Sequence, residues 1–197
     1  LTPNRVDKIK EPIQSIFWIM KDDALPPLVK ITDPRLASIL GCTLMTKRST
    51  AENTGAGANL DALVIEPYAN PFRVYPLVED YEKFKALFDK GVDCYIINTG
   101  DFLGKKVTKE VSLGVIETVV DGKANFELFG GLPGMEYLPV EGYEVPDMNG
   151  EYAELIRDRM QFRLDYLKAF NDANPEHQIP QDALESIKTI ERFIDVL

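Results

Sequence analysis

Three uninterrupted runs of apolar residues predict buried β-strands in this chain. They cover residues 16–20 (IFWIM), 62–66 (ALVIE) and 94–97 (CYII). A short continuous apolar run bounded by polar or turn-forming residues is typical of a strand that is covered on both faces. The run at 25–27 (LPP) is expected to be extended or turning, because a residue that precedes proline avoids the helical conformation.

Apolar residues spaced three and four positions apart predict helices between these strands. Asp33 and Pro34 are typical of a helix start, and we expect Gly41 to end that helix. A second helix is expected after Pro76. The apolar positions of this helix are Leu77, Tyr81, Phe84 and Phe88, and those of a third are Val111, Val115, Ile116 and Val119. We expect Gly91 and Gly122 to end these two helices.

Two amphipathic helices, 151–172 and 181–195, are predicted to complete the chain. The segment 129–146 is rich in glycine and proline and is expected to be an irregular connection. The pattern predicts a mixed α/β (α+β) fold with a central mixed sheet, flanking helices and two C-terminal helices. We expect residues 1–150 to form one domain and residues 151–197 a helical extension packed on it.

Charge and composition restrict the function. The chain has 22 Lys and Arg against 32 Asp and Glu, a net charge of -10, which disfavours nucleic-acid binding. It contains no apolar run of membrane-spanning length, so no membrane partner is expected. A cytoplasmic location is also expected. Cys42 and Cys94 are far apart and indicate a reducing compartment. His177 is the single histidine, so a catalytic triad or a histidine-rich zinc site is not expected.

The turn after the third apolar run is the strongest candidate for ligand binding. Gly100 and Gly104 allow close approach of the backbone, Lys105 and Lys106 add positive charge, and a helix is expected to start near Thr108. These features suit a nucleotide. The spacing does not match a phosphate-binding P-loop, however, and on local features a solvated basic turn is favoured about two to one.

A second candidate is the segment 43–60, which is small, polar and rich in glycine and is expected to be a mobile surface loop. Lys47 and Arg48 within it could close over a phosphate, although an ordinary solvated loop is the more common explanation of such a pattern. The acidic pairs 22–23 and 79–80 are expected to be solvated faces rather than metal sites.

Several segments, in this order, resemble the C-terminal part of the ATP-dependent phosphoenolpyruvate carboxykinase family. Residues 6–12 (VDKIKEP) are similar to an Ile-Asp-x-Ile-x-x-Pro segment, 16–27 to the strand that leads into Leu-Pro-Pro, and 70–72 (NPF) to Ala-Pro-Phe. Residues 98–122 (NTG…GKK…DG) are similar to an Asn-Thr-Gly turn, Gly-Lys-Arg, a helix and a closing glycine. The resemblance covers roughly residues 6–145. Lys106 and Leu113 stand where the family has arginine, and 43–52 lacks the Ala-Gly-Thr-Glu core of the family's lid.

The resemblance implies a carboxykinase C-terminal fold in which the turn surrounds the adenine and ribose of ATP. Lys106 would pack on the base, and Ser112 would occupy the position of a threonine near the nucleotide. The implied nucleotide-binding residues are Asn98, Thr99, Gly100, Gly104, Lys105, Lys106, Val107 and Ser112. The implied lid residues are Thr43, Lys47, Arg48, Ser49 and Thr50.

By the same resemblance, the phosphate loop, the metal ligands and the oxaloacetate-binding residues belong to an upstream domain of the same polypeptide. No catalytic or metal-binding residue is therefore expected in this chain, and a divalent metal is expected only in the full-length protein. The chain alone is expected to be inactive and to bind ATP weakly. The alternative is a non-catalytic relative that serves nucleotide sensing or subunit contacts.

Overall fold

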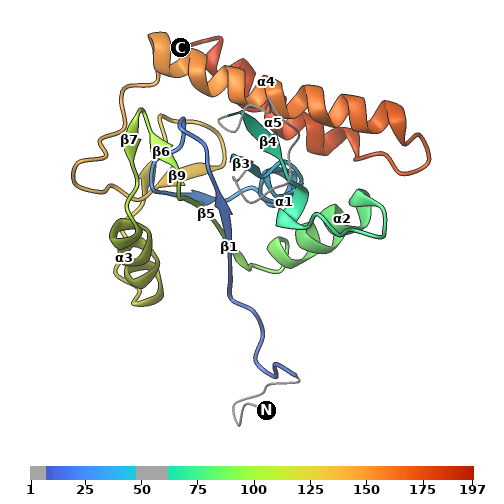
Figure 1. The fold of residues 1–197 in the computed structure, drawn as a ribbon, viewed down its shortest axis with the longest axis horizontal. Coiled ribbons are helices and arrows are strands. Elements are labelled where there is room, and N and C mark those ends of the chain that lie inside the picture. Colours follow the sequence, from blue (N-terminus) through green and yellow to red (C-terminus); the bar gives the residue numbers. More distant parts are fainter. Residues whose placement is uncertain (1–7, 48–61) are drawn as a thin grey trace, which may run out of the picture.

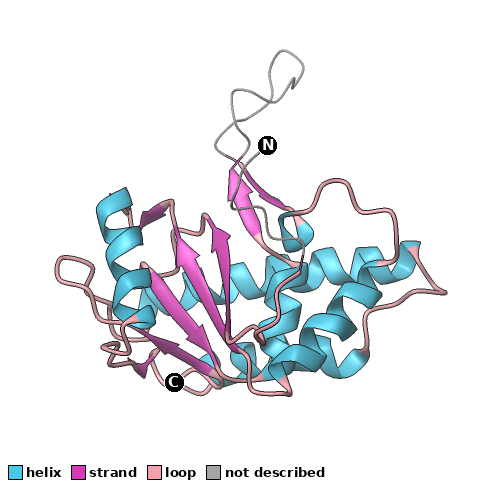
Figure 2. Ribbon diagram, turned by 90° about the horizontal axis from the view of Figure 1, so that it is seen from below, coloured by secondary structure: helices cyan, strands magenta, loops and turns pink. Residues whose placement is uncertain are grey.

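The computed structural model describes residues 8–47 and 62–197, and a five-stranded mixed sheet organises it (Figures 1 and 2). The strand order is β1-β5-β2-β9-β8. β1 runs parallel to β5, and the remaining neighbours are antiparallel. These strands are β1 (Ser15–Met20), β2 (Leu28–Ile31), β5 (Asp93–Asn98), β8 (Glu127–Leu128) and β9 (Met135–Tyr137).

Two short hairpins lie outside this sheet, and five helices accompany it in the described ranges. The hairpins are β3 (Met45–Lys47) with β4 (Leu63–Ile65), and β6 (Asp101–Phe102) with β7 (Lys105–Lys106). A short 3₁₀ turn covers Pro67–Ala69. The helices are α1 (Pro34–Cys42), α2 (Leu77–Phe88), α3 (Lys109–Val120), α4 (Gly150–Ala173) and α5 (Gln181–Ile194). Among the described residues, none of these helices combines the length and apolarity needed to cross a membrane.

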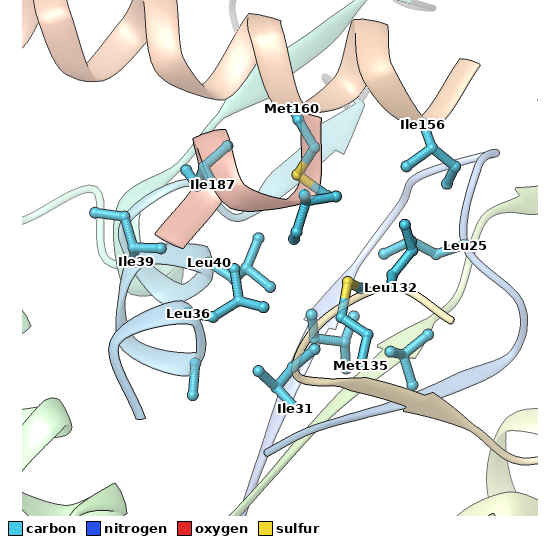
Figure 3. Close-up of a cluster of buried hydrophobic side chains, with 14 of the residues drawn as sticks. Leu25, Ile31, Leu36, Ile39, Leu40, Leu132, Met135, Ile156, Met160 and Ile187 are labelled. Carbon is cyan, nitrogen blue, oxygen red and sulfur yellow. The ribbon is translucent and has the colours of Figure 1, made fainter. Parts of the chain in front are cut away.

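The main hydrophobic core lies between one face of the sheet and helices α1, α2, α4 and α5. Figure 3 shows side chains of β2, α1, α4 and α5 converging there, among them Ile31, Leu36, Met160 and Ile187. α4 and α5 pack against each other, and α5 also packs against α1. The two C-terminal helices therefore complete the core over the sheet. The division of the chain at residue 150 stays a prediction.

A smaller cluster covers the opposite face of the sheet, where α3 packs alone (Figure 1). Leu28, Tyr95 and Ile97 point to this side, and Val115 of α3 meets them. The central strand β5 is thus covered on both faces, as its continuous apolar sequence requires. Phe17 stacks on Tyr95 here, with ring centroids 4.8 Å apart.

The structure confirms the mixed α/β class, the strands at 16–20 and 94–97, and all five expected helices. Three expectations are wrong in detail. Gly41 does not end α1 but lies inside it, and the last helical residue is Cys42. Residues 62–66 form only the half-buried β4, which pairs with β3 outside the main sheet. The start of the expected loop 43–60 is ordered as β3, and its residues from 48 onward lie outside the described part of the chain.

We expect Gly41→Ala to destabilise the protein, because a Cβ at this position would lie 2.4 Å from a ring carbon of Tyr68. Overpacking of this kind costs about 1–3 kcal/mol. The matched control is Gly114→Ala in α3, where a Cβ would meet nothing within 4 Å. That change should instead stabilise the helix by about 0.5–1 kcal/mol. Urea denaturation of both variants measures the difference, and equal effects would contradict the packing argument.

Asp33 should stabilise the fold in a pH-dependent way. Its carboxylate accepts hydrogen bonds from the backbone N–H groups of Arg35 (2.8 Å) and Leu36 (3.0 Å). Partial burial alone would raise the pKa of Asp33, but these bonds and the Arg35 guanidinium outweigh it and lower the pKa. The carboxylate therefore stabilises the fold above its unfolded pKa of about 4, and the stabilisation is lost as the pH falls through the lower folded value.

Asp33→Ala should accordingly cost about 1 kcal/mol at neutral pH, and the difference from wild type should shrink in acid. Asp33→Asn keeps a side-chain acceptor but cannot ionise, so its stability relative to Asp33→Ala should not depend on pH. Thermal unfolding between neutral and acid pH tests this. A constant difference between Asp33→Ala and wild type at every pH would contradict the role of the charge.

Candidate functional site

The candidate site lies where the parallel strands β1 and β5 end side by side. Met20 and Asn98 are register partners at the ends of these strands. Just beyond them, Gly100 lies against Lys21, and a Cβ at Gly100 would be 3.1 Å from the Cβ of Lys21. The carboxyl ends of strands are where ligands bind in open α/β sheets, so the location suits a binding site.

Asn98 holds the loops at this edge together. Its side-chain amide donates to the carbonyls of Asp22 (2.8 Å), Leu25 (2.6 Å) and Asp101 (2.9 Å). Its side-chain oxygen accepts from the backbone N–H of Gly100 at 2.9 Å. Asn98 is fully buried, so the structure gives it a role in fixing the loops and leaves its side chain away from solvent.

The predicted turn is a tight hairpin, β6–β7. Leu103 and Gly104 connect the strands with positive φ angles of 47° and 80°, as a two-residue type I′ turn requires. The N–H of Leu103 donates to the carbonyl of Asp23 (2.9 Å), and that of Val107 donates to Gly100 (3.0 Å). The hairpin is therefore anchored at its tip and at its base, and Val107 is buried beneath it.

The two lysines of the hairpin point to different partners. The ammonium group of Lys105 donates to the Gly142 carbonyl and lies 4.7 Å from the centre of the Tyr143 ring. The ammonium group of Lys106 donates to the carbonyl of Thr99 at 3.2 Å. Lys106 thus stays beside the strand end, whereas Lys105 is directed to the 139–146 segment.

Ser112 lies one turn into α3, close to the hairpin in sequence. Thr108 caps this helix by accepting from the N–H of Val111 (3.3 Å), and the Ser112 hydroxyl donates to the Thr108 carbonyl (3.1 Å). Thr99 also has a backbone role, because its N–H donates to Met20 at 2.9 Å. Of the predicted nucleotide-binding residues, Asn98, Thr99, Gly100 and Lys106 therefore lie around the end of β5. Lys105 is directed to Gly142, and the Ser112 hydroxyl is used within α3.

The expected lid starts at the same place. The N–H of Lys21 donates to the carbonyl of Met45 (2.9 Å), which joins the beginning of β3 to the end of β1. The ammonium group of Lys47 lies 4.0 Å from a carboxylate oxygen of Asp101. Thr43 is fully buried and its hydroxyl donates to the Ile39 carbonyl (2.9 Å), so its side chain caps α1. Arg48, Ser49 and Thr50 lie outside the described residues.

A buried ionic network joins the loop after β1 to α4, and no pattern in the sequence predicted it. Asp22 and Arg163 of α4 are each only 1% exposed, and their charged groups are 3.1 Å apart. Arg159 contacts Asp22 at 3.2 Å and Asp23 at 2.6 Å. The expectation that residues 22–23 form a solvated face is wrong for Asp22, because two arginines one helical turn apart compensate its burial.

The second acidic pair, residues 79–80, also differs from its expected solvated face. Asp80 is buried and forms an ion pair with Arg73 at 2.9 Å. The sequence offered one signal for the ion pairs of Asp22 and Asp80. Arg159 and Arg163 are four residues apart and so lie on the same side of a predicted helix. Such arginines are usually solvent-exposed.

Burial sets the ionisation of these groups. It raises the pKa of Asp22, and the guanidinium groups of Arg163 and Arg159 oppose that shift. Burial also lowers the pKa of Arg163 to about 10. Asp22 and Arg163 pair with each other away from solvent, so we assign them a structural role rather than proton transfer.

The described residues offer neither a group of metal ligands nor an exposed thiol. Within 8–47 and 62–197, no three His, Cys, Asp or Glu side chains are grouped so that they could hold a metal ion. Cys42 and Cys94 are free and buried. Burial raises the pKa of the Cys42 thiol to about 12, so it stays protonated and unreactive at neutral pH.

A pocket of about 650 Å³ lies on the α4 side of the hairpin tip. Leu103, Tyr152 and Leu155 provide its apolar lining. Of the hairpin residues, only Leu103 lines this pocket, so it is distinct from the strand-end site formed around Gly100 and Lys106.

Comparison with known proteins does not assign the chain to a family. No protein-family model matches it, and no curated protein matches it in sequence.

Asn98→Ala should be strongly destabilising, because it leaves buried backbone carbonyls without donors. The expected cost is at least about 2 kcal/mol. Asn125→Ala, at an exposed position, is the matched control and should change stability by less than about 0.5 kcal/mol. Chemical denaturation compares the two, and a near-neutral Asn98→Ala would show that water replaces these hydrogen bonds.

Proposed function

We propose that this chain contacts the base and ribose of a nucleotide, as the C-terminal domain of a phosphoenolpyruvate carboxykinase-like protein. The observation that carries the proposal is the meeting of two segments at one strand end. The hairpin with Lys106 follows β5, and the lid strand β3 is hydrogen-bonded to the residue that follows β1.

Electrostatics support this position for an anionic ligand. The chain carries a net charge of -10, yet Lys21, Lys47 and Lys106 all belong to the segments that meet here. Asp101 partly offsets them through its contact with Lys47. A phosphate group could compete with Asp101 for Lys47, which would couple ligand binding to the position of the lid strand.

The phosphates themselves would need further contacts. Phosphoryl transfer requires a metal ion and several groups that hold the phosphates. In the proposed arrangement these belong to an upstream domain, and this chain supplies the contacts to the base and the lid. ATP is the proposed nucleotide, and a divalent metal would act only in the complete protein.

A non-catalytic role in nucleotide sensing or subunit contacts is the second candidate. The observation that favours it concerns Lys105. Its ammonium group already contacts the Gly142 carbonyl and the Tyr143 ring and so is directed away from the proposed ligand. Lys106 also replaces the planar guanidinium that would stack better on a base. Only one of the two hairpin lysines is then oriented toward the proposed ligand.

The test is an NMR titration of the labelled chain with ATP and with adenosine. We expect a dissociation constant on the order of a millimolar for ATP, with shifts centred on residues 98–112. Lys106→Ala should raise that constant about two- to fivefold, because it removes a cation beside the base. Lys109→Ala removes an equally charged side chain that is 86% exposed, and it should have little effect.

Shifts confined to α4 and α5 would place the ligand elsewhere and overturn the proposed site. Equal effects of Lys106→Ala and Lys109→Ala would indicate non-specific charge attraction. If ATP and adenosine cause no shifts at all, the nucleotide proposal fails and the subunit-contact alternative is favoured.

A further inference from the structure

β1 forms one edge of the main sheet, and no strand of the described part of the chain pairs with its outer side. The N–H of Asp93 donates to Gln14 and that of Thr99 donates to Met20, so the even-numbered residues of β1 face β5. The backbone groups of Ser15, Phe17 and Ile19 therefore point outward. Within residues 8–47 and 62–197, they form no backbone hydrogen bond.

This edge lacks the features that normally prevent strands from pairing between molecules. Such edges usually carry a lysine, a proline or a bulge. β1 reads SIFWIM, with no charge and no proline, and it pairs regularly with β5 over its whole length. Ile19 is 63% exposed at the edge. A strand of this kind is a template for another extended segment.

The segment that precedes β1 has the properties of such an extended partner. Figure 1 shows it running away from the body of the protein. Ile9 and Ile13 are 71% and 53% exposed, although they are large apolar side chains. Pro12 lies at an even position, so its missing N–H would face away from a strand that pairs with the odd-numbered residues. We call residues 9–13 the arm.

We propose that a second copy of this chain covers the open edge, with the arm of each copy pairing antiparallel to β1 of the other. A two-fold axis at Gln14 places Ser15 opposite Ile13 and Ile19 opposite Ile9 of the second copy. All of these residues have odd numbers, so their backbone groups face each other. The pairing ends before Lys21, whose N–H is already bonded to Met45.

The proposal is independent of nucleotide binding and is tested by sedimentation equilibrium of the full chain over a range of concentrations. We expect a reversible monomer–dimer equilibrium. Because each copy carries a charge of -10, added salt should strengthen the dimer by screening repulsion. A wild-type chain that stays monomeric at every concentration overturns the proposal and leaves the edge to a different partner.

Ile19→Lys should raise the dimer dissociation constant at least about tenfold, because a lysine on the edge opposes pairing. The matched control is Leu128→Lys, which adds the same charge to β8 at the opposite edge, where the side chain is 72% exposed. It should leave the dimer unchanged. Equal effects of the two variants would overturn the assignment of the interface to β1.

A second pair of variants tests which backbone N–H groups of the arm take part in the proposed pairing. Both changes lie in the arm, outside the sheet and the helices. Glu11→Pro removes an N–H that the proposed pairing uses, whereas Lys10→Pro removes one that faces away. Both residues are exposed, so circular dichroism of the two variants should match wild type. Only Glu11→Pro should weaken the dimer, and the reverse order would contradict the register.

Discussion

The buried ion pair between Asp22 and Arg163 is the constraint on which the arrangement of the sheet and the C-terminal helices depends. Both groups are removed from water, which costs several kcal/mol for each ion unless the partner is present. α4 can therefore pack against the sheet only in the position that brings Arg163 to the end of β1. A guanidinium N–H of Arg163 also donates to the carbonyl of Thr43, so the same side chain fixes the exit from α1. Apolar packing alone would allow α4 to slide, whereas a buried charge requires one register.

The same loop connects this constraint to the candidate site. Asp22 exchanges hydrogen bonds with Asn98, and the carbonyl of Asp23 holds the tip of the β6–β7 hairpin. Asp23 also contacts Arg159 of α4. The strand end, the hairpin and the helix are thus parts of one hydrogen-bonded unit, although they are far apart in the sequence. A substitution in α4 could then change the hairpin without touching a ligand.

Local patterns in the sequence predicted the elements that depend on local chemistry. The cap at Asp33, the apolar run of β5 and the amphipathic pattern of residues 151–172 each led to an element that the structure contains. The short strands β2 and β9 were missed, because their pairing comes from distant segments and each has too few residues to show a period. The role of Gly41 was misread for a similar reason. A glycine near a helix end usually terminates it, but here it makes room for the Tyr68 ring, which approaches from a segment beyond β4.

In the candidate site, too, local patterns in the sequence predicted the local element but not the contacts with distant segments. The sequence located the turn after β5 correctly, yet it could not distinguish residues that build the turn from residues that face outward. Asn98 and Val107 are buried, and Lys105 is directed to Gly142, so three of the residues implied by the resemblance hold the hairpin in place. The backbone groups of Gly100 are also used within the fold, by Asn98 and Val107, so the charged groups that remain for a ligand are the ammonium groups of Lys106 and Lys47. Since Lys47 belongs to β3 and Lys106 to β7, an anion that contacts both would tie the two hairpins together, and neither hairpin alone presents the pair of charges.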